Sequence, residues 1–207
     1  MAAIFNRNDL SSPSAYNASQ TALLLLDFQP FIIAQVEDRG TRALNMSVRL
    51  RDWALQHKML VIHSIVDVNG QVPKTAKGAS RLQQYVASLS HDQASCKEHS
   101  SIAPISNELE HTIPKRPGIV SNIASQQMQS LLAKNNIKSL VVCGLSTSGA
   151  VLRTCVQATD QEFVCTVVED ACADKTEELH DILVKDVLSS RAHVTTAANL
   201  MKEWKPQ

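Results

Sequence analysis

The stretch VVCGLSTSGAVLRTCVQA, from Val141 to Ala158, has the pattern of a buried strand, a tight turn and the start of a helix. Its first residues are apolar, its middle is rich in glycine and serine, and its end favours a helix. In an open parallel sheet, this kind of junction lies at the carboxyl end of a strand, where ligands bind. We therefore expect the turn from Ser146 to Ala150 to belong to a functional site.

The rest of the chain repeats the alternation of strand and helix. Near-continuous apolar runs, typical of strands buried on both faces, cover residues 21–28, 59–68, 137–144 and 163–174. Helical patterns cover residues 41–58, 79–89, 121–136, 148–161 and 175–190, and a short element is expected at 193–204. The sequence predicts one domain over residues 1–207, with an irregular lead-in at 1–20. Its expected fold is a three-layer α/β/α sandwich with a mostly parallel, open, Rossmann-like sheet.

Composition argues against several classes of protein. Lys and Arg together number 20, as do Asp and Glu, so no charge excess predicts binding to nucleic acid or an anionic membrane. The longest apolar run, TALLLL, is much shorter than the roughly 20 residues of a spanning helix, and no conventional signal peptide is visible. The 5 cysteines are odd in number and form no CxxC pair, which favours reduced, buried thiols. We expect a soluble cytoplasmic protein, with unconventional secretion left open.

The turn after the third apolar run lacks the common catalytic signatures. Neither GxxxxGK[ST], GxGxxG nor GxSxG occurs there, and the scattered histidines form no HExxH or HxH pair, so we expect no metal and no cofactor. Cys155 lies five residues beyond Ala150, a rotation of roughly 140° on a helix, so it is expected to pack in the core, as is Cys143. The backbone N–H groups from Ser146 to Ala150 can instead hold an anion or an oxyanion.

Two charged residues stand out at expected ends of apolar segments. Asp27 ends the run LLLLDFQPFI, where burial should raise its pKa unless a nearby cation lowers it. Lys115 lies between two prolines in HTIPKRPGIVSN, an apolar approach to a glycine turn. Each has an ordinary alternative, since an Asp can cap a turn and a lone Lys is usually solvated. Together they predict a proton-handling ion pair at one edge of the sheet.

These pieces, in this order, resemble the isochorismatase-like hydrolase superfamily, which includes nicotinamidases and N-carbamoylsarcosine amidase. The resemblance covers residues 21–196, nearly the whole chain. It depends on LLLLDFQPFI, on PKRPGIVSN, on VVCGLSTSGAV and on the following VVEDACAD. The third segment is the most specific, because the family has G-[VI]-x-T-x-x-C-V there. Each segment is weak alone, whereas four in the same order make a strong resemblance.

The resemblance implies a role for several residues. Asp27 matches the family's catalytic acid/base, Lys115 its catalytic lysine, and Gln29 the polar residue beside the acid. The Leu145–Ser146 bond falls where the family often has a cis peptide, and the amides around Ser146 and Ala150 match its oxyanion hole. Ala150, however, occupies the place of the amidases' nucleophilic cysteine, and an alanine methyl cannot attack a carbonyl. The nicotinamidase metal segment D-x-H-P-x-x-H has no counterpart in this sequence.

The isochorismatase branch of the family fits this pattern, because the resemblance implies that it keeps the acid and the lysine and has a small residue in place of the cysteine. Here the small residues are Gly149 and Ala150, and Arg116 is expected to help bind the carboxylates of a small-molecule substrate. The substrate-binding residues that the resemblance implies are Gln29, Arg116, Ser146, Gly149 and Ala150. The implied reaction converts isochorismate and water to 2,3-dihydro-2,3-dihydroxybenzoate and pyruvate without a covalent intermediate.

Two alternatives remain open at this stage. One is a repurposed, non-catalytic family member that binds a small carboxylate or a protein partner, and the other is an amide hydrolase whose cysteine has been replaced by Ala150. Specificity residues are expected between Val72 and Ile113, where the sequence gives no readable pattern. The resemblance also implies self-association as a dimer or tetramer, with the apolar helix at 148–158 as a candidate surface.

Overall fold

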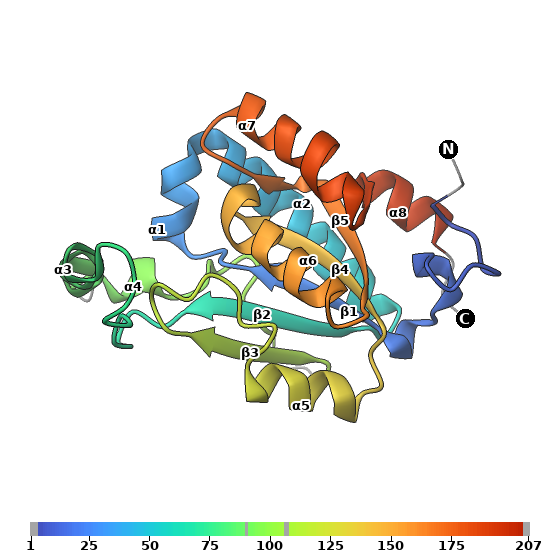
Figure 1. The fold of residues 1–207 in the computed structure, drawn as a ribbon, viewed down its shortest axis with the longest axis horizontal. Helices are drawn as coiled ribbons and strands as arrows, with labels where there is room; N and C mark the ends of the chain where they lie inside the picture. Colours follow the sequence, from blue (N-terminus) through green and yellow to red (C-terminus); the bar gives the residue numbers. More distant parts are fainter. Residues whose placement is uncertain (1–3, 90, 106–107, 205–207) are drawn as a thin grey trace.

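A computed structural model of the chain describes residues 4–89, 91–105 and 108–204. The described strands form one six-stranded sheet in the order β3-β2-β1-β4-β5-β6, and every neighbouring pair is parallel (Figure 1). The strands are β1 (Thr21–Leu26), β2 (Leu60–Val66), β3 (Glu110–Lys115), β4 (Ser139–Leu145), β5 (Val164–Ala173) and β6 (His193–Thr195). The predicted open parallel sheet is therefore confirmed.

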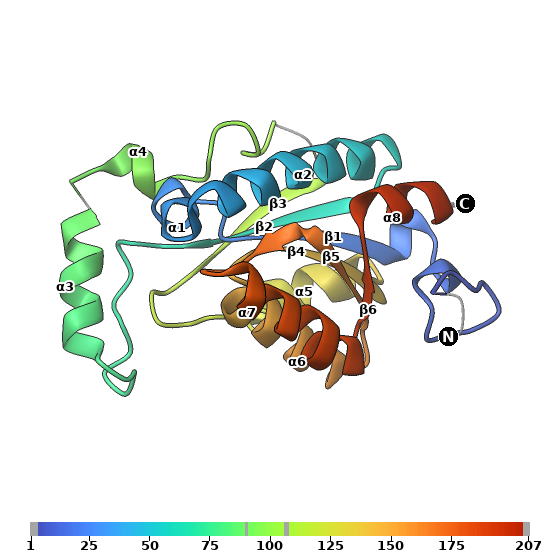
Figure 2. The ribbon, with the colours of Figure 1, turned by 90° about the horizontal axis from the view of Figure 1, so that it is seen from above.

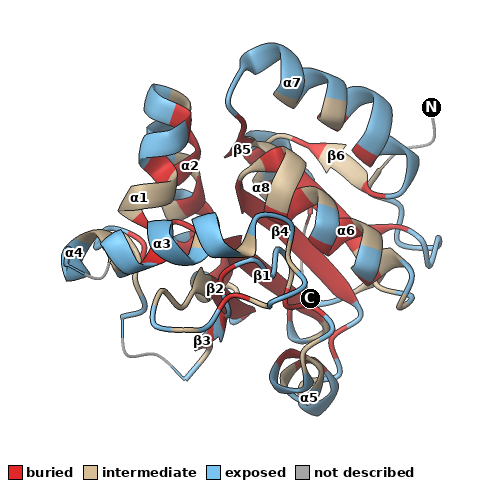
Figure 3. Ribbon diagram, turned by 60° about the vertical axis from the view of Figure 1, so that its left-hand side comes forward, coloured by how far each residue is buried: buried red, intermediate tan, exposed pale blue. Residues whose placement is uncertain are grey.

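The central strand β1 explains why the sheet needs cover on both faces. All six of its residues, TALLLL, are buried, and β2 and β4 pair with it on its two edges. Leu24, for example, is the Cα partner of Ile62 on one side and of Val142 on the other. A strand with leucine on both faces is stable only between two layers of helices, and Figure 3 shows the buried strands enclosed in this way.

The helices supply those two layers. They are α1 (Pro30–Ile33), α2 (Glu37–Gln56), α3 (Ala79–Leu89), α4 (Gln93–Cys96), α5 (Gln126–Lys134), α6 (Leu152–Thr159), α7 (Glu177–Ile182) and α8 (Ala197–Glu203). Figure 2 shows α2 and α8 on one face of the sheet and α5, α6 and α7 on the other. The predicted three-layer α/β/α arrangement is therefore confirmed.

Helix α2 is the longest element, and it starts four residues before the predicted position. Its first turn contains Glu37 and Asp38, whose charges suit the positive end of a helix dipole. Its buried face, which includes Leu50 and Trp53, packs across the sheet. Trp53 also contacts Trp204 edge-on, with ring centroids 5.3 Å apart, and so joins α2 to the C-terminal segment.

Two elements differ from the sequence-based expectation. The segment Glu110–Lys115 is an edge strand, where Pro114 is tolerated because an edge position does not require every backbone N–H. The polar segment at 90–101, which was not expected to be helical, contains α4, although Ser90 lies outside the described residues. The long helix predicted at 175–190 is present: α7 continues without a break through a wide helical turn at Leu183–Val187 and a tight one at Leu188–Ser190.

The irregular lead-in is attached to the C-terminal part of the chain. Its described part, from residue 4, contains two short turns, Pro13–Ala15 and Ala18–Gln20. The indole Nε1 of Trp204 donates a hydrogen bond to the carbonyl of Pro13 (3.1 Å), and a ring nitrogen of His193 lies 2.6 Å from the carbonyl of Ser11. Within the described residues, no helix has the length and apolar character needed to cross a membrane.

Candidate active site

Asp27 directly follows β1, at the carboxyl end of the central strand. Its backbone N–H donates to the carbonyl of Ser64 (2.8 Å), and its φ of 62° turns the chain away from the strand direction. Only 6% of the residue is exposed. The position predicted from the sequence is therefore a buried carboxyl group at the edge of the sheet where ligands bind.

Lys115 is the last residue of the edge strand β3 and reaches past β2 to Asp27. Its Nζ lies 2.6 Å from each carboxylate oxygen of Asp27, and only 5% of the lysine is exposed. The carbonyl of Lys115 accepts a hydrogen bond from Asp67, which fixes the strand end beside β2. The parallel sheet thus brings together two residues that are 88 positions apart in the sequence.

The environment of this pair keeps a proton on Asp27 to a higher pH than usual. Burial raises the pKa of the Asp27 carboxyl, and it outweighs the opposing effect of the charge and hydrogen bonds of Lys115. A second carboxylate, Glu98, raises this pKa further. A carboxyl group whose pKa lies above its ordinary value is suited to donate a proton near neutral pH.

Gln29 follows Asp27 closely, but its side-chain amide is occupied by the main chain. The amide nitrogen donates to the carbonyls of Val66 (2.9 Å) and Cys96, and the amide oxygen accepts from the N–H of Val66 (2.7 Å). Gln29 is completely buried. These bonds hold β2 and α4 against the Asp27 turn, and a contact of Gln29 with substrate stays a prediction.

The turn after β4 has the backbone form that the family resemblance implied. The Leu145–Ser146 peptide bond is cis, and Ser146 precedes a wide turn at Thr147–Val151 that leads into α6. The N–H groups of Gly149 and Val151 donate to the carbonyl of Ser146, and Ala150 is 2% exposed. The amides of Gly149 and Val151 are therefore occupied within the turn itself. The oxyanion hole at Ser146 and Ala150 stays a prediction.

Two residues that sequence reasoning missed hold this turn in place. Asp174, at the carboxyl end of β5 and 1% exposed, accepts hydrogen bonds from the N–H groups of Ser148 (2.5 Å) and Lys175 (2.8 Å). The hydroxyl of Thr147 lies 2.8 Å from Nδ1 of His180 in α7. The rule that singled out Asp27, an acid at the carboxyl end of a buried strand, also applies to Asp174.

Arg116 follows Lys115 and has an exposed side chain. Its loop is fixed to the sheet by Asn122, which donates to the carbonyl of Ile113 (3.0 Å) and accepts from the hydroxyl of Ser64 (3.2 Å). The same loop passes close to the turn after β4, since Val120 would lie 4.0 Å from a Cβ placed on Gly149. Arg116 lies in the loop that leads from Lys115 to Val120, and its role in binding carboxylates stays a prediction.

The cysteines do not supply a substitute nucleophile at Ala150. Cys143 and Cys155 are fully buried, as predicted, and the five cysteines form no disulfide. Burial raises the pKa of the Cys143 thiol to about 12. A hydrogen bond to Cys165, together with burial, raises the pKa of the Cys155 thiol well above its usual value. Neither thiol is thus readily converted to the nucleophilic thiolate.

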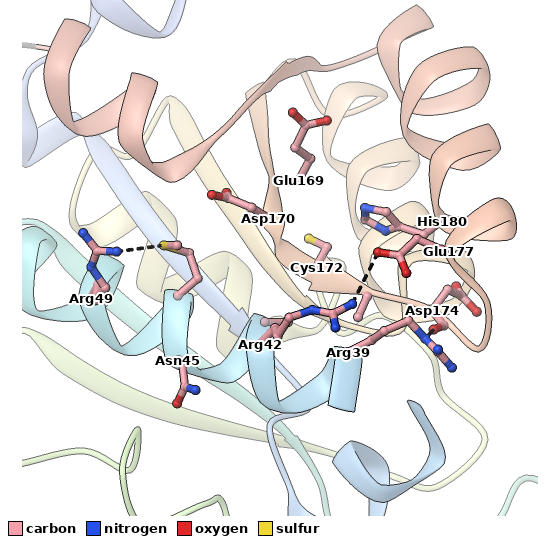
Figure 4. A pocket seen from close by; sticks show the side chains of 13 residues that line it. Arg39, Arg42, Asn45, Arg49, Glu169, Asp170, Cys172, Asp174, Glu177 and His180 are labelled. Atoms are coloured by element: carbon pink, nitrogen blue, oxygen red, sulfur yellow. Dashed lines mark hydrogen bonds and ion pairs between the residues drawn. The ribbon is translucent and has the colours of Figure 1, made fainter. Parts of the chain in front are cut away.

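Two cavities lie near the site. One, of about 480 Å³, lies between α2 and the end of β5, and Figure 4 shows Arg42 of its basic wall directed at Glu177 of its acidic wall, 3.3 Å away. Arg39 from the same wall donates to the carbonyl of Asp174. The other, of about 450 Å³, lies over the ends of β2 and β3 and is lined partly by Asp67 and Lys97. Neither cavity is lined by Asp27, Lys115 or Ala150.

Fold and site together define a class of α/β proteins that hold a buried Asp–Lys pair beside the start of a helix. The model of the isochorismatase domain matches residues 21–199, so the chain belongs to the isochorismatase family. It is 33% identical over 86 residues to the isochorismatase family protein YddQ of Bacillus subtilis. That match covers 42% of this chain and 46% of YddQ, so it spans about half of the length of this relative.

Solved structures share the fold over most of the chain at low sequence identity. An isochorismatase family protein from Burkholderia thailandensis is 15% identical, with a TM-score of 0.70 over 90% of this chain and 96% of that chain. The MAR1 ribonuclease of Caenorhabditis elegans is also 15% identical, with a TM-score of 0.69 over 91% of this chain and 83% of that chain. These likenesses concern the fold, and the chemistry has to be argued from the site.

Proposed function

We propose that the protein is an isochorismatase-type hydrolase that cleaves the enol-pyruvyl ether of isochorismate to 2,3-dihydro-2,3-dihydroxybenzoate and pyruvate. The observation that carries this proposal is the buried Asp27–Lys115 pair, in which Asp27 has a raised pKa, beside a helix start with Ala150 in the place of a nucleophile. A vinyl ether needs a proton donor and water for its hydrolysis, and it does not need a thiol.

The reaction begins with transfer of the Asp27 proton to the methylene carbon of the enol-pyruvyl group. This step leaves a positive charge shared between the ether oxygen and the adjacent carbon, and Asp27 becomes a carboxylate stabilised by Lys115, 2.6 Å away. Water adds to that carbon and loses a proton to Asp27, which restores the acid. The hydroxyl proton of the resulting hemiketal passes to the ether oxygen as the bond between that oxygen and the former vinyl carbon breaks, so that pyruvate and the dihydroxy acid leave.

Binding of the two substrate carboxylates requires cations outside the ion pair. Arg116 is exposed and follows Lys115 directly, so its guanidinium is the candidate for a bidentate contact with one carboxylate. The Asp27 and Lys115 residues are 6% and 5% exposed, so the substrate must also displace covering side chains to reach them. We propose that the loop around Val120, beside Gly149, is the part that gives way.

The test is pyruvate release from isochorismate by the full chain. We expect Asp27→Asn to lower the rate by about 10²–10⁴-fold, because the variant keeps the shape of the side chain and loses the acid. The control is Asp38→Asn, which changes an exposed carboxylate of α2 and should leave the rate unchanged. Folded wild-type protein that releases no pyruvate above background would contradict the proposal.

One observation favours a second candidate, a family member that binds a small carboxylate without turning it over. Both carboxylate oxygens of Asp27 are held by Lys115, and the pair lines neither cavity described above. In that case wild type and Asp27→Asn should be equally inactive on isochorismate, and the ¹⁵N resonance of Lys115 should still shift on addition of pyruvate.

An amide hydrolase that has lost its cysteine makes a different prediction. Ala150→Cys would place a thiol in the last part of the turn that precedes α6, and that variant, but not the wild type, should then release ammonia from simple amides. Wild-type pyruvate release together with an Ala150→Cys variant that cleaves no amide supports the isochorismatase proposal.

A further inference from the structure

The cavity between α2 and the end of β5 is separate from the proposed hydrolytic pair, which does not line it. Its volume of about 480 Å³ lies in the range of roughly 300–1,000 Å³ that is usual for small-molecule sites. Charged side chains from α2, β5 and α7 surround it, as Figure 4 shows. The apolar part of its lining comes from α2 and β5 and consists of Ala43, Met46, Cys172 and Ala173. The cavity therefore has the size and the mixed lining of a ligand site.

An irregularity in β5 brings two adjacent acids to this cavity. In a regular strand, Glu169 and Asp170 would point to opposite faces of the sheet. The pairing of β5 with β4 shifts its register between Val142 and Gly144, so that β5 has more residues than β4 over this stretch. Both carboxylates consequently line the same cavity. Bulges of this kind re-aim side chains and are common beside binding and active sites.

The acidic wall has carboxylate oxygens that the chain itself does not use. Glu169 is half-buried, and no hydrogen bond or ion pair joins it to another residue that the structure describes. Asp170 accepts a hydrogen bond from the N–H of Ala197 on Oδ1 (2.8 Å), which leaves Oδ2 for another donor. These acids are not a metal site, since no group of three or more His, Cys, Asp or Glu residues in the described ranges could hold a metal ion.

The basic wall is formed by arginines on one face of α2, and two of them are weakly held. Arg42 lies 3.3 Å from Glu177 of α7, but the two side chains are 63% and 74% exposed, so this ion pair contributes little and can be exchanged. Arg49 forms no ion pair with any described residue and donates only a long bond to the sulfur of Met46 (4.0 Å). A bound carboxylate can therefore take these guanidinium groups as partners.

The third arginine, Arg39, has a different role, because the main chain already occupies it. Its Nε donates to the carbonyl of Asp174 (3.1 Å), and its terminal nitrogen donates to the carbonyl of Lys175. These bonds fix the end of β5 against α2. Arg39 thus holds the cavity wall in place, and the charged groups left for a ligand are Arg42 and Glu169.

The facing walls of opposite charge disfavour a ligand that carries a single charge. A simple anion on Arg42 would lie in a cavity that Glu169, Asp170 and Glu177 also line, and a simple cation on Glu169 would share it with the arginines. Like charges in one site repel, and this repulsion is a means of excluding the wrong ligand. A small molecule with one positive and one negative group has a partner on each wall.

We propose that this cavity is a binding site for an α-amino acid or another small zwitterion. The carboxylate of the ligand contacts Arg42 and displaces the exposed Glu177, and its ammonium group contacts Glu169. Its side chain lies against the apolar part of the lining. The site does not involve the Asp27–Lys115 pair, so its occupancy is independent of the proposed hydrolysis.

The first test is a titration of the ¹⁵N-labelled full chain with L-leucine, followed by NMR. Two comparison compounds keep the apolar side chain and lack one charge each: 4-methylpentanoate has no ammonium group, and 3-methylbutylamine has no carboxylate. We expect saturable shifts at the amides of Arg42 and Cys172 with leucine, and a Kd at least about tenfold higher for either comparison compound. Glycine and L-phenylalanine extend the series to smaller and larger amino acids.

No saturable shift with any of the three amino acids would overturn the proposal. A Kd for 4-methylpentanoate or 3-methylbutylamine as low as that for leucine would also overturn it, because the cavity would then bind a single charge. Pyruvate release from isochorismate does not enter either result, so failure of the hydrolase proposal leaves this one standing.

The second test removes one charge from each wall. Arg42→Gln and Glu169→Gln should each weaken leucine binding by about tenfold, since each deletes one charge-assisted contact. The matched controls are Arg191→Gln, which changes a surface arginine paired with Asp160, and Glu178→Gln, which changes an exposed acid of α7 outside the cavity. Both controls should bind leucine as wild type does. Unchanged binding in both cavity variants, or equal weakening in the controls, would contradict the assignment.

Discussion

Asp27 and Lys115 form a fully desolvated ion pair, and such pairs are kept at a cost in stability. Each charge loses its hydration on burial and regains only part of that free energy from its partner. Here Nζ of Lys115 lies 2.6 Å from both carboxylate oxygens of Asp27, so both oxygens are bonded to the same ammonium group. A pair of this kind indicates a requirement for the charges themselves, which agrees with a role in proton transfer.

Replacing both residues with apolar ones should therefore stabilise the protein. We expect the double variant Asp27→Leu/Lys115→Met to gain about 1–4 kcal/mol in the free energy of unfolding, whereas Asp27→Leu alone loses about 3–5 kcal/mol because it leaves a buried, unpaired lysine. Urea denaturation followed by circular dichroism measures both. A double variant that is less stable than wild type would show that the pair contributes net stability.

The raised pKa of Asp27 predicts the direction of a pH effect on stability. Folded protein keeps this proton at pH values where the unfolded chain has lost it, so stability falls as pH rises from the ordinary value of 3.8 through the raised one. Relative to the double variant, wild type should therefore lose free energy of unfolding across that window. Wild-type stability that stays constant or rises relative to the double variant across that window would contradict the assignment.

For individual residues, the sequence indicated which positions belong to the candidate site better than it indicated which side chains contact each other. Asp27, Lys115 and Ala150 were recognised because motifs name single positions, and the pairing of the first two follows from parallel strand order. The contacts of Gln29 and the contact of His63 with Glu98 were not predictable, because they join a strand to a polar loop at 90–101 that has no periodic pattern. Side chains that meet across a loop leave no regular spacing in the sequence.

Among the elements, β4 and the turn that follows it depend on one glycine. Gly144 has φ 147° at the irregularity in the β4–β5 pairing, and a Cβ there would lie 2.3 Å from the carbonyl oxygen of Leu26. That approach lets β4 run against the end of β1, which carries Asp27 next to it. The glycine therefore fixes how close the turn and the acid can be.

Substituting Gly144 should lower the free energy of unfolding by more than its positive φ alone explains. We expect Gly144→Ala to lose about 3 kcal/mol or more in the free energy of unfolding, because backbone on both strands must move. Gly78→Ala is the matched control, since Gly78 also has a positive φ, of 71°, but has nothing within 4 Å of the added Cβ. It should lose about 1 kcal/mol. Equal losses in urea unfolding would show that the contact with Leu26 is unimportant.

The turn before α6 is held by β5 and α7, and its anchor Asp174 can be removed. Asp174→Ala leaves the N–H groups of Ser148 and Lys175 without their acceptor, so the variant should lose about 1–3 kcal/mol per group. Amide hydrogen exchange in the turn at 146–150 should rise at the same time. Glu178→Ala, an exposed substitution in α7, is the control and should change neither quantity.

The secondary-structure elements also show which features the sequence pattern predicts and which it does not. Strands buried on both faces were found because their apolar runs are continuous, as in TALLLL. The edge strand Glu110–Lys115 was missed because its burial alternates and it contains a proline. The helix at 175–190 was predicted as one piece, and the widening of its turns at Leu183–Val187 has no glycine or proline to mark it.

For the whole molecule, the sequence-based prediction of the three-layer fold was accurate, whereas its proposal for an association surface stays a prediction. In the helix at 148–158, Cys155 and Ala158 are buried in the core of the same chain, and Leu152 and Val156 are partly exposed. Exposed apolar side chains also occur in and after α7, at Leu179, Ile182 and Val187. Self-association as a dimer or tetramer stays a proposal that a molar-mass measurement can decide.

The order β3-β2-β1-β4-β5-β6 also has a consequence during synthesis on the ribosome. Strands β1, β2 and β3 can pair as soon as they emerge, but the other edge of β1 has no neighbour until β4 is translated, more than one hundred residues later. Throughout that interval an open edge formed by four leucines faces solvent or a chaperone. A chain interrupted before Ser139 would keep this edge permanently and should be retained in aggregates.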